Sequence, residues 1–155
     1  MKNFIVAVHI FFLFSDSKEW PSHTVCRESD LKVYYRSCDP LQDIGFSMEP
    51  CTKVLPDVLH IKLALLLRRD IRQLVLKISI FKQSLKLFSF SYPLCEQTST
   101  YYSFCGRKKG EFIYFEGPIK SGISTVPKEE YDLSLELINE DMYNIACVNI
   151  TLIGH

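Results

Sequence analysis

The sequence predicts an all-β fold, an immunoglobulin-like sandwich of two antiparallel sheets. Two observations lead to this class. Apolar and polar residues alternate over seven short runs, which is the period of a β-strand. Clusters of Pro, Gly, Asp and Ser separate the runs, and no run keeps a helical period over three turns. Eight or nine amphipathic strands of this kind bury their apolar faces by packing as two sheets face to face.

The alternating runs give the expected strands in chain order. They cover residues 31–37, 44–48, 60–70, 72–82, 111–117, 131–137 and 145–153. At the end of the third run we expect Arg68, Arg69 and Asp70 to form the tight connection of a hairpin. The segments 91–100 and 116–122 have the composition of loops. An immunoglobulin domain proper would have a Trp between two distant cysteines, whereas Trp20 precedes the first cysteine.

One parity of each run is apolar, and we expect it to face the opposite sheet. With two residues from between the runs, this inward set comprises Val33, Tyr35, Ile44, Phe46, Met48, Ile61, Leu63, Leu74, Leu76, Ile78, Ile80, Phe104, Ile113, Phe115, Val126, Tyr131, Leu133, Leu135, Val148 and Ile150. The same apolar side chains would be needed in a closed core and in the wall of a cavity. The pattern alone therefore favours an ordinary packed core.

The first 17 residues have the pattern of a secretory signal. Lys2 supplies a positive charge, residues 4–14 are almost wholly apolar, and Ser15 and Ser17 are small residues before the expected cleavage point. The apolar run is too short to span a bilayer. We therefore expect residues 18–155 to form one secreted domain without a transmembrane segment.

Six cysteines in a secreted chain predict three disulfides. No two of them have the close spacing of a zinc site, so we expect no metal. Six cysteines allow fifteen pairings, and only Cys95 with Cys105 can be argued from the residues, as the ends of a local loop. Asn149, Ile150 and Thr151 form an N-glycosylation sequon, and Asn149 has the outward parity that a glycan requires.

Charge and motifs exclude two classes of function. The chain has 18 basic and 18 acidic residues, so it has no one-signed field to hold a nucleic acid. It contains neither a Gly-x-Ser-x-Gly nor a His-Glu-x-x-His motif, and its adjacent acidic pairs, residues 129–130 and 140–141, are typical of solvated turns. We expect no enzyme activity and no cofactor.

Four stretches carry a resemblance to a known family. They are CDPLQDIGFSMEPC (38–51), LRRDIRQL (67–74), FSYPLCE (90–96) and YSFCGRKKGE (102–111). They resemble the lipid-recognition (ML) family that contains the myeloid differentiation proteins. The match runs from about Val25 to the C-terminus, with all six cysteines in order.

The resemblance implies that the two sheets are splayed around an apolar lipid cavity. It implies the disulfides Cys26–Cys51, Cys38–Cys147 and Cys95–Cys105. It makes the inward set, without Tyr35, the candidate lipid-binding residues. Among them we expect Phe104, Ile113, Phe115 and Val126 at the cavity mouth, and residues near Cys38–Cys147 as plain core.

The resemblance also implies two sites at the surface. Arg107, Lys108 and Lys109 would lie at the rim, where their side chains can meet a lipid phosphate. Arg68, Asp70, Tyr102 and Ser103 match positions near which relatives dock their receptor. Gly106 and residues 98–100 lack charges that the receptor-signalling relative has there.

The implied function is that of a secreted co-subunit of a leucine-rich-repeat receptor, held at the cell surface through it. The expected partner is the ectodomain of the radioprotective homologue of the Toll-like receptors. The expected ligand is a phospholipid, lipid A or another acyl lipid, and the complex would modulate innate responses to lipopolysaccharide. The alternatives are a free lipid or sterol carrier without a receptor, and an adhesion module with a closed core.

Overall fold

The computed structural model describes residues 19–98 and 101–155. The expected secretory signal, residues 1–17, lies outside the described residues, as do Ser99 and Thr100. The described part of the chain contains strands and turns and no helix. Its nine strands are β1 (His23–Arg27), β2 (Leu31–Ser37), β3 (Gly45–Glu49), β4 (Val58–Leu66), β5 (Leu74–Lys82), β6 (Leu85–Cys95), β7 (Phe112–Lys120), β8 (Glu129–Asn139) and β9 (Asn144–Gly154).

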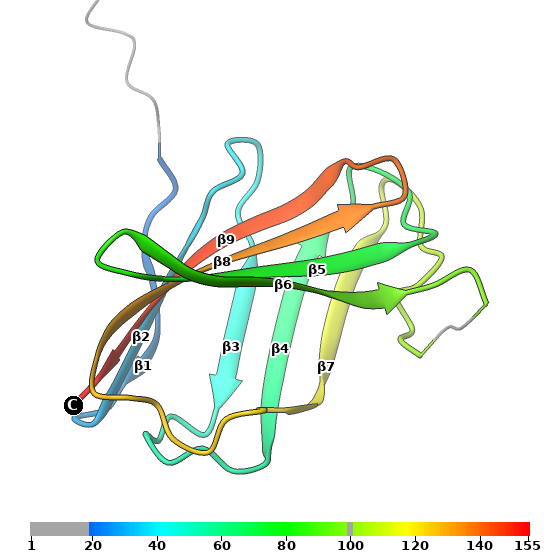
Figure 1. The fold of residues 1–155 in the computed structure, drawn as a ribbon. Helices are drawn as coiled ribbons and strands as arrows, with labels where there is room; N and C mark the ends of the chain where they lie inside the picture. The colour runs from blue at the N-terminus through cyan, green and yellow to red at the C-terminus, as the bar shows by residue number, and fades with distance from the viewer. Residues whose placement is uncertain (1–18, 99–100) are drawn as a thin grey trace, which may run out of the picture.

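The strands form two antiparallel sheets of unequal width. The large sheet has the order β1-β2-β9-β8-β5-β6, and the small sheet has the order β3-β4-β7. Figure 1 shows the strands of the small sheet running across those of the large sheet. The predicted all-β sandwich of two antiparallel sheets is therefore confirmed.

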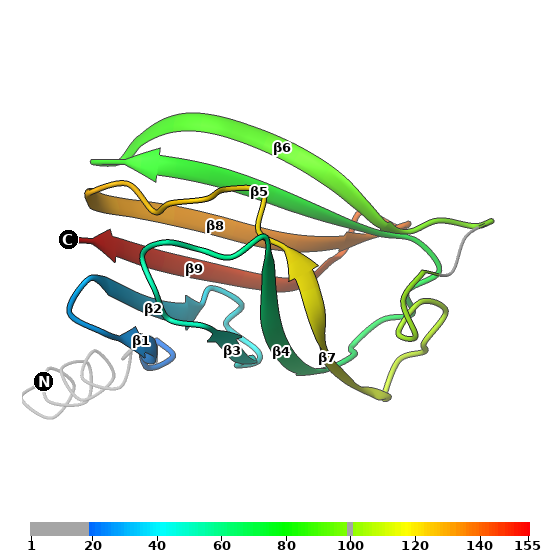
Figure 2. The same ribbon diagram turned by 90° about the horizontal axis from the view of Figure 1, so that it is seen from below.

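The two sheets are joined on one side and separate on the other. Strands β1 and β3 are in contact, and the disulfide Cys26–Cys51 links β1 to the segment after β3. The buried Tyr35 hydroxyl of β2 donates to the Ile44 carbonyl at 2.8 Å and accepts from the Phe46 N–H at 3.2 Å. On the other side, no described residue of β6 comes within 8 Å (Cα–Cα) of β7. No strand contact therefore joins the β6 and β7 edges of the two sheets (Figure 2).

The core lies along the closed side and at the two ends. Leu31, Val33 and Cys26 from β1 and β2 are almost completely buried. Leu67 and Ile71, in the segment between β4 and β5, are equally buried. Among the described residues no helix is long and apolar enough to cross a bilayer.

Two strands were not anticipated from the sequence, and β6 is the informative one. Its apolar residues change parity between Leu87 and Phe88, and the ladder to β5 shifts register at the same place, where Ile80 pairs with Phe88 and Phe81 with Lys86. A bulge of this kind inserts a residue and conceals the alternation. The other missed strand, β1, has only five residues and contains a register shift of its own.

The predicted hairpin connection at Arg68–Asp70 is wrong. Strand β4 belongs to the small sheet and β5 to the large one, so residues 67–73 cross between sheets. The expected loops 91–100 and 116–122 are also partly strand, because Pro93 lies in β6 and Pro118 in β7. Both strands are sheet edges, where a proline can lack its N–H without losing a ladder bond.

All six cysteines are paired in the way the resemblance implies: Cys26 with Cys51, Cys38 with Cys147 and Cys95 with Cys105. The second bridge spans 109 residues, and the third spans only 10. In the chain-entropy description the longer loop constrains the unfolded chain more, so the second bridge contributes the most to stability.

A strand glycine at the end of the sandwich supplies a test of this packing. A Cβ on Gly154 would lie 2.2 Å from the Pro127 carbonyl oxygen, whereas a Cβ on Gly117 would make an ordinary 3.4 Å contact with Phe115. We expect Gly154→Ala to lower the free energy of unfolding by about 1–3 kcal/mol, because the Pro127 backbone must move. Urea unfolding measures this change.

The matched control is Gly117→Ala, which we expect to stay within about 1 kcal/mol of the parent. Equal unfolding midpoints for the two variants would contradict the close packing of β9 against residues 126–128.

Candidate functional site

An apolar cavity of about 210 Å³ lies between the two sheets. Tyr102 carries the one polar side chain in its wall. The lining residues are Ile44, Phe46, Ile61, Leu63, Leu65, Leu67, Ile71, Leu74, Leu76, Leu94, Tyr102, Phe104, Ile113, Phe115, Ile119, Leu135, Leu137, Ile145, Ala146, Val148 and Ile150. A wall of this chemistry offers contacts to hydrocarbon and almost none to a polar ligand.

The cavity walls follow from strand alternation. In the small sheet, Ile61, Leu63 and Leu65 of β4 face the cavity while Lys62 between them is exposed. In the large sheet, Leu135 of β8 pairs with Val148 of β9, so their side chains lie together on the inward face. The cavity therefore has one wall from each sheet.

Twelve residues of the candidate lipid-binding set lie in the cavity wall. They are Ile44, Phe46, Ile61, Leu63, Leu74, Leu76, Phe104, Ile113, Phe115, Leu135, Val148 and Ile150. Val148 adjoins Cys147, so the expectation that residues near Cys38–Cys147 are plain core is wrong for this residue. Ile145 and Ala146, also near that disulfide, line the cavity as well.

The remaining seven residues of that set do not line the cavity. Val33 belongs to the core between β1 and β9, and Met48 lies on the edge strand β3. The other four strand residues face inward but lie toward the free end of the β5–β6 hairpin, beyond the cavity: Ile78, Ile80, Tyr131 and Leu133.

The expected place of Val126 at the cavity mouth is wrong. Val126 is buried, its N–H donates to the Lys53 carbonyl, and its side chain lies beside Gly154. Gly154 pairs with Glu129 at the start of β8. The loop of Phe104 is instead bonded to Ile71, and the neighbouring Asp70 carbonyl accepts from Asn139, where β8 ends. Val126 and Phe104 are therefore at opposite ends of the sandwich.

Sequence reasoning missed eight lining residues. Leu65 and Leu137 continue the apolar parity of their strands, and Ile119 does so in β7, where Pro118 suggested a loop. Leu67 continues the parity of Ile61 and Leu63 beyond the end of β4, whereas Ile71 had no periodic signal because it lies in the crossing segment. Leu94 and Ile145 adjoin positions where a ladder shifts register, which hides their parity, whereas Ala146 shares the inward parity of Val148 and Ile150.

Three aromatic rings form one end of the cavity. Tyr102 and Phe104 stack with ring centroids 5.0 Å apart, and Phe115 of β7 meets both rings edge-on at 5.8 and 5.9 Å. Such arrangements fix ring orientation. The side chain of Tyr102, a candidate receptor contact, therefore lies in the cavity wall, while Ser103 next to it is exposed.

Two segments that contribute no strand close this end of the cavity. They are the crossing segment 67–73 and the loop 101–111, which we call the end wall. The N–H groups of Leu67 and Ile71 donate to the carbonyls of Glu111 and Arg107, and the loop returns two further backbone bonds from Gly106 and Gly110. The end wall is thus a backbone-paired unit whose apolar side chains face the cavity.

The three candidate rim cations lie in the end wall and point to solvent. The Arg107 guanidinium is 3.4 Å from the Glu111 carboxylate, and the Lys108 N–H donates to that carboxylate at 2.5 Å. The Lys108 N–H, and after it Arg107, lower the pKa of Glu111. Within the described residues Lys108 and Lys109 form no ion pair, so both ammonium groups are available to an anion.

Hydrogen bonds to neighbouring segments hold the crossing segment in place. The Asp70 carboxylate accepts from the Lys109 N–H at 2.8 Å, and Asn139 donates to the Asp70 carbonyl at 3.0 Å. The Glu140 carboxylate accepts from the Arg72 and Gln73 N–H groups, each at 3.1 Å. The carboxylate of Asp70, a candidate receptor residue, is therefore engaged inside the end wall.

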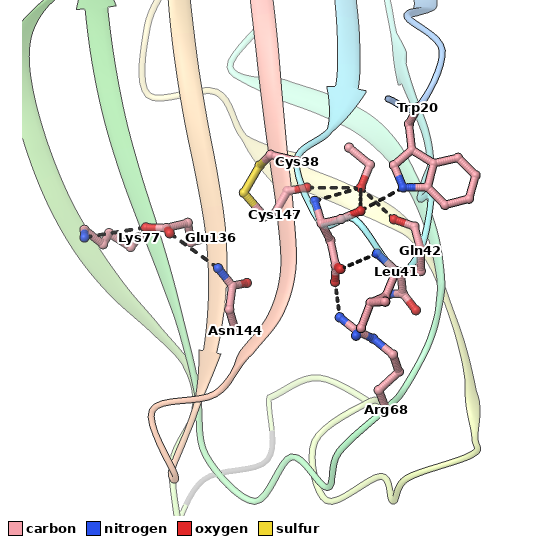
Figure 3. The surroundings of a disulfide bond; sticks show 11 residues. Trp20, Cys38, Leu41, Gln42, Arg68, Lys77, Glu136, Asn144 and Cys147 are labelled. Atoms are coloured by element: carbon pink, nitrogen blue, oxygen red, sulfur yellow. Dashed lines mark hydrogen bonds and ion pairs between the residues drawn. A yellow bond between two sulfur atoms is a disulfide. The ribbon is translucent and has the colours of Figure 1, made fainter. Parts of the chain in front are cut away.

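Arg68, another candidate receptor residue, is largely buried beside Cys38–Cys147 (Figure 3). Its guanidinium forms an ion pair with Asp39, whose side chain is 8% exposed. Asp39 also accepts from the Leu41 N–H at 2.9 Å. The Arg68 guanidinium packs 5.8 Å from the centre of the Tyr143 ring. The structure thus gives Arg68 an internal role, tying the crossing segment to the closed side.

Asn149 lies on the outward face of the large sheet. It pairs with Arg36 of β2 and Ser134 of β8, and its side chain is exposed. A glycan attached there would project away from the cavity. No group of three or more His, Cys, Asp or Glu residues that could hold a metal occurs in the described part of the chain.

Comparison with known proteins assigns the family. No protein-family model matches the chain. The chain is 42% identical to human lymphocyte antigen 86, over 98% of both proteins, and 46% identical to the mouse protein, over 86% of this chain and 82% of the relative. The chain belongs to the lymphocyte antigen 86 family. Bovine lymphocyte antigen 96 is more distant, at 31% identity over 84% of this chain and 83% of that protein.

A solved structure of this family has the same fold. Chicken MD-1, determined in complex with lipid IVa, is 40% identical, matches 88% of this chain and 99% of its own, and superimposes with a TM-score of 0.83. A Niemann-Pick type C2 protein from the Japanese carpenter ant shares the fold at 17% identity, with a TM-score of 0.51 over 86% of this chain and 95% of its own. The relatives are lymphocyte antigens and not enzymes, in agreement with the expectation from motifs.

The stability of this member of the lymphocyte antigen 86 family should depend on the Arg68–Asp39 ion pair. We expect Arg68→Ala to lower the free energy of unfolding by about 3 kcal/mol, because it leaves the Asp39 carboxylate buried without its cation. Chemical unfolding followed by circular dichroism measures the loss.

Arg72→Ala serves as the control, since Arg72 lies in the same segment with an exposed side chain, and its effect should stay within about 0.5 kcal/mol. The internal role of Arg68 is refuted when both variants unfold at the parent midpoint.

Proposed function

We propose that this protein is a secreted lipid-binding co-subunit of a leucine-rich-repeat receptor and that acyl chains occupy the cavity between its sheets. The observation that carries the proposal is the apolar wall of the 210 Å³ cavity, with Tyr102 as its one polar side chain. The lipid IVa bound to chicken MD-1, a homologue at 40% identity, supports the same ligand class.

The magnitudes favour a hydrocarbon ligand. Each buried methylene contributes about 0.8 kcal/mol, so an acyl chain gains several kcal/mol from the carbons that enter the cavity, before entropy losses. An apolar void of 210 Å³ destabilises its host by about 5 kcal/mol when it stays empty. That cost is comparable to the whole stability of a small domain. A bound acyl chain removes the void and replaces water contacts at the same time.

The surface residues fit a lipid with an anionic headgroup. Lys108 and Lys109 are exposed in the end wall, and the guanidinium of Arg107 is only loosely paired. We propose that these three side chains meet the lipid phosphate, while Phe104 and Phe115 contact the chains beneath. Phospholipid and lipid A both combine these two chemistries.

The three disulfides fit an extracellular protein. We propose that residues 1–17 direct secretion and that Asn149, exposed on the outward face, carries a glycan. Attachment to the cell surface would then come through the receptor, for which the radioprotective Toll-like homologue is our proposed partner. In this role the protein modulates responses to lipopolysaccharide.

Lipid binding is tested on adjacent residues of β4. Ile61→Gln places an amide without a partner in the path of an acyl chain and should weaken binding of a fluorescent phospholipid at least about tenfold. Lys62→Gln, one residue along on the solvent side, should leave the affinity within about twofold.

Mass spectrometry of an organic extract from the purified protein provides the second measurement. We expect bound acyl lipid in the parent and less in Ile61→Gln. A parent protein that carries no lipid and binds none argues for a closed adhesion module.

Receptor binding is tested at Ser103. Among the candidate receptor residues, its side chain is exposed and has no hydrogen bond to the rest of the end wall in the described structure. Ser103→Arg should reduce co-purification with the radioprotective receptor ectodomain at least about tenfold, because a bulky cation enters the interface. The control is Ser91→Arg, because Ser91 is also exposed but lies on the outward face of β6. This change should leave co-purification with the receptor ectodomain unchanged.

Both serine variants should retain lipid binding, because neither side chain lines the cavity. A parent protein that binds lipid and captures no leucine-rich-repeat ectodomain favours the free-carrier alternative.

A further inference from the structure

An aromatic stripe runs along β6, outside the cavity. Its members are Phe88, Phe90 and Tyr92, which are 63%, 51% and 57% exposed. They pair with Ile80, Ile78 and Leu76 of β5, so all three rings project from the inward face of the large sheet. An inward face is normally covered by the opposite sheet, so three exposed rings in a row require an explanation.

The stripe is exposed because the small sheet does not reach it. Figures 1 and 2 show the β5–β6 hairpin extending past β3, β4 and β7. Strand β6 is also the outermost strand of the large sheet. Each of the three rings keeps more than half of its surface exposed.

The edge of β6 is unsuited to pairing with a strand of a second molecule. Pro93 lacks an N–H, and the β5–β6 ladder is irregular near both ends, at Leu74–Val75 and at Ile80–Phe81. Lys86 places a charge near the start of the strand. Prolines, bulges and lysines are the devices by which natural sheets prevent edge-to-edge association. The rings are thus exposed on a strand that resists strand addition.

The stripe continues into the cavity at one end. Tyr92 pairs with Leu76, which lines the cavity, and Leu94, two residues further along β6, lines it too. The disulfide Cys95–Cys105 then joins the end of β6 to the end wall, where Lys108 and Lys109 are exposed without ion pairs in the described structure. The aromatic stripe therefore leads to the cavity wall, and Cys95–Cys105 places the free positive charge of the end wall next to the end of β6.

We propose that Phe88, Phe90 and Tyr92 dock the protein on an anionic lipid bilayer, so that acyl chains pass between the bilayer and the cavity along β6. The inference rests on the proposed lipid binding. The hydrophobic gain that retains a chain in the cavity equally opposes its release into water. A continuous apolar path from the stripe to the cavity wall removes that barrier, and aromatic rings with nearby lysines suit a bilayer surface of negative charge.

The test compares Phe→Ser variants of two edge strands, β6 and β7. The test variant is Phe88→Ser with Phe90→Ser, and the control is Phe112→Ser, a 62% exposed ring on the outward face of β7. Vesicles of phosphatidylcholine, with and without phosphatidylserine, are used for co-flotation. Uptake of a fluorescent phospholipid is followed from these vesicles and, separately, from dilute ethanol solution.

The parent should float with vesicles containing phosphatidylserine and take up lipid at a rate that rises with vesicle concentration. The test variant should lose flotation and slow vesicle uptake at least about tenfold, since each buried ring contributes to docking. Its equilibrium binding of lipid from ethanol should remain within about twofold of the parent. Phe112→Ser should resemble the parent in all three measurements.

Three results would overturn docking through the stripe. One is a loss of flotation and of vesicle uptake in Phe112→Ser as large as in the test variant. Another is a rate of lipid uptake that does not depend on vesicle concentration, which indicates transfer through water. The third is sedimentation in which the parent is a dimer and the test variant a monomer, because the stripe would then be a contact between two copies. A protein that floats with vesicles but binds no lipid from either source instead contradicts the cavity function and leaves docking supported.

Discussion

The constraint on which the structure depends is the unequal width of its two sheets. A sheet of six strands cannot be covered by a sheet of three, so part of its inward face must remain uncovered. Because the sheets are joined at the β1–β3 side, the uncovered part lies at β5 and β6. The same apolar face therefore serves as packed core near β2, as cavity wall in the middle, and as exposed stripe at β6.

The stabilisation that each apolar side chain provides therefore differs along this face. Residues such as Leu31 and Val33 are almost completely buried and stabilise the fold in the ordinary way. The cavity side chains have partners on one side only and so lose part of their packing energy. A ligand that binds the folded protein and not the unfolded chain restores that energy by mass action. Stability and ligand occupancy are therefore coupled in this fold.

Much of the fold was predictable, because seven strands keep a clear alternation and the turns are rich in Pro, Gly and Asp. The bounds of β2, Leu31–Ser37, agree with those of the predicted run. What the pattern could not show is which strands share a sheet. The apparent hairpin at Arg68–Asp70 connects two sheets, and no local signal distinguishes a turn from a crossing of that length. Strand β6 was hidden by its bulge and by Pro93.

The candidate site was predictable to the extent that strand parity defines it. Ile61, Leu63 and Leu135 were assigned to the inward face, and they line the cavity. Parity does not fix position along a strand, so Ile80 and Leu133 face inward but lie beyond the cavity. The residues of the end wall have no periodicity, and their places follow from backbone pairing between distant segments. The resemblance to the ML family, and not the alternation, indicated that the sheets are splayed.

The end wall has a consequence for how this architecture can diversify. Its two segments meet through main-chain hydrogen bonds, which any residue but proline can make, and they contribute nothing to either sheet ladder. Lengthening or shortening them would move the floor of the pocket in or out while the strands stay where they are. Receptacles for longer or shorter hydrocarbon tails could thus arise from insertions and deletions in two turns, without redesign of the sandwich itself.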